Sequence, residues 1–91
     1  MFIISGGKGI GKTRTLLERA SAENAIIICE DPIVMRERAH KYGIVGLELV
    51  SYEEAWNLKE SQLNRPMYIH DINKFIKYKL PTIKGYSFCT E

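Results

Sequence analysis

The sequence predicts an α/β fold, a three-layer sandwich in which helices cover both faces of a central, mostly parallel sheet of about five strands. Short apolar runs alternate along the chain with segments of helical periodicity. The run at 25–29 is apolar throughout, as in a strand that is covered on both faces. Alternation of strands and helices is typical of parallel sheets with right-handed crossovers. We expect residues 1–91 to form a single domain.

The first elements are a strand, a glycine-rich loop and a helix. Residues 2–4 are β-prone, and the following segment 5–11 contains four glycines, which excludes a regular helix or strand there. Residues 12 to about 22 contain no glycine or proline and repeat apolar residues at helical spacing, which predicts a helix. The apolar run at 25–29 is the second expected strand.

Two further helices have clear start signals. Asp31 as N-cap and Pro32 at the first helical position predict a helix to about residue 42, where Gly43 can take the left-handed conformation. Ser51 with Glu54 three residues later fits a capping box. The other expected elements are a strand at 47–50, a helix from 52 to about 60, a loop at 61–65, a strand at 67–70, a helix at 72–80 and a final strand at 86–89.

Composition excludes several classes of protein. The apolar runs are far shorter than the roughly 20 residues of a membrane-spanning helix, and no secretory signal pattern opens the chain, so we expect a cytoplasmic protein without a membrane partner. Cys29 and Cys89 lie in strand-like runs without metal spacing and are expected to be reduced, buried thiols. Basic residues number 13 against 11 acidic ones, but segment 65–84 is locally basic.

Residues 6–13 match the pattern G-x-x-x-x-G-K-[ST] without departure. The matched residues are Gly6, Gly7, Lys8, Gly9, Ile10, Gly11, Lys12 and Thr13. Glycines let the backbone present N–H groups to phosphate oxygens, and the N-terminus of the following helix adds partial positive charge. Lys12 would neutralise the β- and γ-phosphates, and Thr13 would place a hydroxyl on Mg²⁺. The alternative is a tight glycine turn without a ligand, which four glycines make entropically costly.

This motif, between a predicted strand and a predicted helix, resembles the P-loop NTPase superfamily, and the resemblance implies ATP or another NTP as ligand with Mg²⁺ as cofactor. In that family a hydrophobic strand ending in aspartate supplies a second magnesium contact, and segment 66–71 looks like it. Two registers remain open. Asp71 is the magnesium aspartate, or His70 stands in its place and Asp71 takes the place of the following acid.

The resemblance also implies candidates for catalysis. Members similar to RecA, helicases and AAA+ proteins use a glutamate after the aspartate to polarise water, but Ile72 and Asn73 follow Asp71 here. Glu30, after the second strand, is the candidate substitute, and its alternative role is to flank the next helix start. Thr90 is the candidate γ-phosphate sensor, with an ordinary strand-end threonine as the alternative. Lys12, Asp71 and Glu30 are therefore the predicted catalytic residues.

The order of strands is also similar to the cores of thymidine kinases and helicase motors, without the additional chain that those enzymes use for an acceptor. A minimal core of this kind resembles short P-loop proteins of phages, which implies a host-cell cytoplasmic location. We therefore expect Mg²⁺-dependent NTP binding with weak or partner-dependent hydrolysis, assisted by self-assembly or by a host or viral protein.

Other functions stay open. One is an interaction module that mimics or inhibits a host ATPase. Another is a nucleic-acid-associated motor fragment that uses the lysines of segment 74–84. A small-molecule kinase ranks last because no acceptor pocket is identifiable. Trp56 is expected to pack in the core rather than stack on a base, whereas His70 fits a site or a core position equally.

Overall fold

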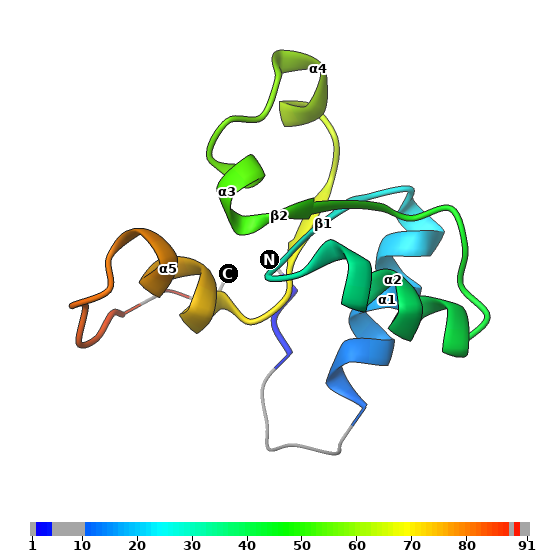
Figure 1. The fold of residues 1–91 in the computed structure, drawn as a ribbon, viewed down its shortest axis with the longest axis horizontal. Helices are drawn as coiled ribbons and strands as arrows, with labels where there is room; N and C mark the ends of the chain where they lie inside the picture. Colours follow the sequence, from blue (N-terminus) through cyan, green and yellow to red (C-terminus); the bar gives the residue numbers. More distant parts are fainter. Residues whose placement is uncertain (1, 5–10, 88, 90–91) are drawn as a thin grey trace.

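The computed structural model describes residues 2–4, 11–87 and 89. Their helices and strands alternate along most of the chain, as Figure 1 shows. In chain order the elements are α1 (Lys12–Glu23), β1 (Ile26–Cys29), α2 (Pro32–Lys41), β2 (Glu48–Ser51), α3 (Tyr52–Ala55), α4 (Glu60–Leu63), β3 (Met67–Ile69) and α5 (Ile72–Lys79). The α/β class predicted from the alternation is confirmed. In the described residues, no helix is both long enough and apolar enough to cross a membrane.

The sheet is parallel and has β1 at its centre. Its strand order is β2-β1-β3, and Ile26 lies opposite both Glu48 and Met67. Every residue of β1 is buried, because this strand has neighbours on both sides and helices on both faces. The apolar run at 25–29 thus contains the central strand of the sheet.

Three strands are present in the described part of the chain, and the expectation of about five is wrong in that respect. The segment 2–4 and residues 86, 87 and 89 are not in strands. A segment forms a strand only where it joins a hydrogen-bonded ladder. These two segments contact helices through their side chains instead. The Arg19 guanidinium lies 3.7 Å from the centre of the Phe2 ring, and the Tyr86 hydroxyl donates to Asn73 on α5.

Two apolar clusters lie on opposite faces of the sheet, since successive side chains of a strand point to opposite sides. On one face Ile27 and Cys29 pack with residues of α1 and α2, including Leu17 and Met35. On the other face Ile26, Ile28 and Val50 pack with Tyr52 of α3, and Phe75 of α5 lies against them. The helices thus form one layer on each side of the sheet.

Both predicted helix caps are present. The Asp31 carboxylate accepts from the backbone amides of Ile33 and Val34, with Pro32 at the first helical position. Ser51 and Glu54 form the reciprocal capping box at the start of α3. These caps begin α2 and α3 directly after their strands, so both helix N-termini lie at the same edge of the sheet.

The segment after β2 differs from its prediction. Helix α3 ends at Ala55 instead of continuing to about residue 60, and α4 occupies part of the expected loop at 61–65. The backbone amide of Lys59 donates to the side chain of Gln62, a local bond that begins this second short helix. Cys89 also differs from its prediction, because it is exposed, whereas Cys29 is buried as expected.

Candidate functional site

The polar residues of interest gather where the three strands end. Because the sheet is parallel, the carboxyl ends of β1, β2 and β3 lie at one edge, and in open α/β sheets ligands bind outside this edge. Helices α2, α3 and α5 begin soon after the strands that precede them, so their N-termini are at the same edge (Figure 1). We take this edge as the candidate site.

The start of α1 is the described part of the glycine-rich motif. Gly11 is the N-cap residue and has φ 74°, a left-handed conformation that a side chain would strain. Lys12 and Thr13, both half-buried, are the first two residues of the helix. Gly6, Gly7, Lys8, Gly9 and Ile10 lie outside the described residues, as does Thr90.

Thr13 is joined to the end of β3 across 57 positions of sequence. Its Oγ1 lies 3.1 Å from Nε2 of His70, the residue that follows β3 directly. A threonine hydroxyl both donates and accepts, so this bond forms with either neutral tautomer of the imidazole. Both residues were candidates for the magnesium site from the sequence, and the structure brings them together.

The backbone of His70 is held on both sides. Its amide donates to the carbonyl of Ile28 at 2.8 Å, which continues the pairing of β3 with β1. Its carbonyl accepts from the hydroxyl of Tyr52 at 2.8 Å, and the same hydroxyl lies 3.3 Å from the carbonyl of Asp71. The imidazole is therefore attached to a backbone segment that β1 and α3 hold in position.

Burial and charge favour a neutral His70. Burial lowers the pKa of the imidazole below its usual 6.5, and the positive charge of Arg38 lowers this pKa further, while the carboxylate of Asp71 acts in the opposite direction. Burial raises the pKa of Tyr52 to about 12, and Asp71 and Glu30 contribute to this rise. Near neutral pH the phenol therefore remains a donor to the two carbonyls.

Asp71 is directed toward the helix that follows it. It has φ 64° and is the N-cap of α5, where its carboxylate accepts from the backbone amide of Lys74 at 3.3 Å. Aspartate tolerates the left-handed conformation better than most residues because its side chain bonds locally. The carboxylate of Glu30 lies 3.5 Å from Nζ of Lys74, and both side chains are exposed.

The structure thus connects the predicted site residues in two groups. Thr13 is paired with His70, and both Asp71 and Glu30 contact Lys74. Two contributors were missed by the sequence reasoning, namely Lys74 as the partner of both acids and Tyr52 as the support of the His70 backbone. The need of a buried tyrosine hydroxyl for a partner was the available signal for Tyr52.

These contacts bear on the expected Mg²⁺ centre. Mg²⁺ takes oxygen ligands in octahedral geometry and is bound through one or two carboxylates. Thr13 has a nitrogen as its partner, and the Asp71 carboxylate already accepts from a backbone amide. Among the described residues no group of three or more His, Cys, Asp and Glu side chains is placed to hold a metal ion. Mg²⁺ binding through Thr13 and Asp71 therefore stays a prediction, since each of these bonds leaves an oxygen lone pair available.

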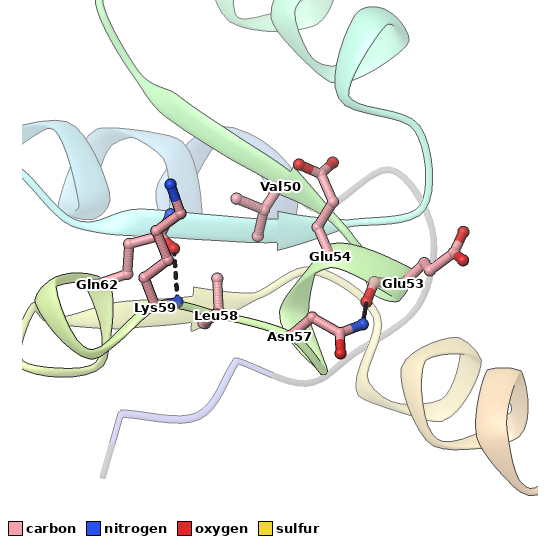
Figure 2. Close-up of a pocket in the computed structure, with 7 residues that line it drawn as sticks. All are labelled: Val50, Glu53, Glu54, Asn57, Leu58, Lys59 and Gln62. Atoms are coloured by element: carbon pink, nitrogen blue, oxygen red, sulfur yellow. Dashed lines mark hydrogen bonds between the residues drawn. The ribbon is translucent and has the colours of Figure 1, made fainter.

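A separate pocket of about 510 Å³ lies beside β2 and contains none of the predicted site residues. Figure 2 shows its lining: Val50, Glu53, Glu54, Asn57, Leu58, Lys59 and Gln62. Its carboxylates, on Glu53 and Glu54, would repel phosphate, and several of its polar groups already bond locally, such as the amide of Asn57 with the Glu53 carbonyl. We therefore place the candidate site at the strand ends and not in this pocket.

Comparison of the chain with protein-family models, with curated proteins and with solved structures found no match. The function is therefore argued from the residues and contacts of the chain itself.

Proposed function

We propose that this protein binds the phosphate chain of ATP or another nucleoside triphosphate at the start of α1. The observation that carries the proposal is the placement of Gly11, Lys12 and Thr13. The motif's last three residues open a helix whose second residue contacts the carboxyl end of β3. Backbone N–H groups of a helix N-terminus favour an anion, and a lysine ammonium supplies a compact positive charge.

Hydrolysis, in this proposal, is weak or depends on a partner. Phosphoryl transfer requires a group that positions the attacking water, and Glu30 is the acid proposed for that role. Its side chain is 65% exposed, and its carboxylate lies beside the Lys74 ammonium, a contact that does not direct it at a bound phosphate. A partner protein or a second copy of the chain is the proposed source of any missing catalytic group.

Calorimetric titration with ATP and ADP tests the proposal. Lys12→Ala should weaken binding at least about tenfold, because a hydrogen bond from a charged donor contributes about 1.5–3 kcal/mol. Lys41→Ala is the matched control, since Lys41 is an exposed lysine at the end of α2. Equal affinity of the two variants, or no binding by the wild type, would refute the proposal.

A second candidate function is contact with nucleic acid through α5 and the residues after it. Lys74, Lys77 and Lys79 lie on α5, and Lys84 follows it. Trp56, expected in the core, is instead 49% exposed, and its ring stacks on Phe75 at 5.0 Å between centroids. Exposed aromatics beside lysines are typical of single-strand binding surfaces.

The acidic residues Glu53 and Glu54 lie close to Trp56 in sequence and oppose phosphate binding there, so we rank this function second. Retention on single-stranded DNA at low salt, lost steeply as salt rises, is the expected behaviour of such a surface. A protein that is not retained at low salt has no such function.

A further inference from the structure

Strand β3 presents an open edge on the side away from β1. The carbonyl of Pro66 and the amide of His70 bond to β1, so the backbone groups at positions 66, 68 and 70 face that strand. Consecutive residues of a strand direct their backbone groups to opposite sides, and the N–H and C=O of Met67 and Ile69 therefore point outward. In the part of the chain that the structure describes, no residue bonds to these outward groups.

The opposite edge of the sheet, on β2, is partly covered. The guanidinium of Arg36 donates to the carbonyl of Leu47 at 3.3 Å, and the carboxylate of Glu54 accepts from the amide of Ser51 at 3.0 Å. Among the described residues β3 has no such cover, and Met67–Ile69 are uncharged and half-buried. A strand edge without charge, bulge or cover is a template for pairing with another strand.

The outward groups of β3 are self-complementary. When a second copy of the strand runs antiparallel about a two-fold axis at Tyr68, Met67 of each copy lies opposite Ile69 of the other. Opposed residues of this kind exchange both of their N–H···O bonds, so every outward group of the strand obtains a partner. The same register brings Arg65 of one copy to the end where Asp71 of the other lies, and opposite charges at facing positions favour pairing.

The start of the chain is another segment near this edge. The ring of Phe2 lies over the guanidinium of Arg19, and this guanidinium is 3.5 Å from the hydroxyl of Tyr68. Residues 2–4 form no backbone hydrogen bond with β3 and are not in a strand. The edge of β3 therefore stays available to a second copy.

We propose that this protein forms a symmetric dimer in which the β3 strands of two copies pair antiparallel. The two sheets then become one continuous sheet with the strand order β2-β1-β3-β3-β1-β2. This interface is isologous, because the same patch is used by both copies, and it goes beyond nucleotide binding and does not depend on it. The two Tyr68 residues form the non-hydrogen-bonded pair on the axis, with their Cα atoms about 4.5 Å apart.

Light scattering of the full chain after size exclusion tests the dimer. The mass of the wild type should approach twice the 10.5 kDa of one chain as protein concentration rises. Ile69→Pro should stay monomeric, because proline removes an outward N–H and leaves the bonds to β1 in place. Circular dichroism checks that this variant is folded. The matched control is Val45→Pro, at a position 72% exposed in the loop before β2, and it should dimerise as the wild type does.

A disulfide test measures the register and does not depend on the folding of Ile69→Pro. In a Cys89→Ser background, Tyr68→Cys places a thiol on the axis, where the Cα separation of about 4.5 Å is within the range of a disulfide. Mild oxidation should link two copies through this thiol. Met67→Cys or Ile69→Cys alone should not form a link, since each lies opposite the other position, but a mixture of these two variants should.

The contrary outcomes are distinct. A wild type that is monomeric at every concentration would overturn the proposal, as would a folded Ile69→Pro that still dimerises. Linking of Met67→Cys alone as readily as Tyr68→Cys would mean a different interface. Slow amide exchange of Met67 and Ile69 in a monomeric wild type would show that residues of the same chain occupy the edge, which also refutes the dimer.

Discussion

Replacement of Tyr52 by phenylalanine isolates the hydroxyl that supports the end of β3. The side chain is buried, and its hydroxyl donates to the carbonyl of His70 at 2.8 Å and lies 3.3 Å from the carbonyl of Asp71. Phenylalanine keeps the ring and its edge-to-face contact with Phe75 at 5.4 Å. The change therefore removes the hydrogen bond while the apolar packing remains.

The expected loss of unfolding free energy is about 1–2 kcal/mol, because two partly buried carbonyls lose their donor. For a domain of this size such a loss corresponds to a decrease in Tm of roughly 5–10 °C. Urea unfolding followed by far-UV circular dichroism measures the change, since its midpoint falls with stability while its slope is kept.

Tyr68→Phe is the matched control. The Tyr68 hydroxyl donates to the carboxylate of Glu23 at 2.7 Å in an exposed position, where water replaces a lost partner. This variant should lose less than about 0.5 kcal/mol. If Tyr52→Phe were no less stable than Tyr68→Phe, the Tyr52 bonds would not hold the His70 backbone as argued.

Three further predictions concern the caps and the thiols. Asp31→Ala should lower the free energy of unfolding by about 1 kcal/mol because α2 loses its cap. The control Glu37→Ala, on the exposed face of α2, should change this free energy little, and urea unfolding of both variants measures the difference. In the native protein a thiol reagent should modify Cys89 rapidly and Cys29 only on unfolding, and equal rates would contradict the difference in burial. Burial, with a smaller contribution from Asp31, raises the pKa of the Cys29 thiol from 9.0 to about 11. The contribution of this thiol to stability is therefore complete below pH 9.0 and is lost as pH rises through about 11. The free energy of unfolding of Cys29→Ala should not show this decrease when it is measured across the same pH range.

Features with a local cause were predictable from the sequence. The caps at Asp31 and Ser51 depend on bonds within three residues, and both are present. The left-handed Gly43 after α2 has φ 76°, as its position at the helix end predicted. The central strand could be recognised because a strand that is covered on both faces is apolar at nearly every position.

Features with a distant cause were not predictable in the same way. Whether residues 2–4 form a strand depends on a ladder partner far along the chain, and Phe2 contacts Arg19 of α1 instead. The contact of Thr13 with His70 joins residues 57 positions apart. Sequence reasoning left both registers of the 66–71 segment open, because the choice between His70 and Asp71 depends on how β3 pairs with β1 and on the cap of α5.

The stack of Trp56 on Phe75 has a consequence for the cooperativity of the molecule. Helix α5 has no fully buried residue, and its contacts with the rest of the described chain include this stack and the ring of Tyr52. A helix attached in this way opens as a unit at lower free energy than the sheet, so its amides should exchange with solvent well before those of β1. Trp56 is the chain's sole tryptophan, and its fluorescence should therefore change when α5 opens, before the sheet unfolds.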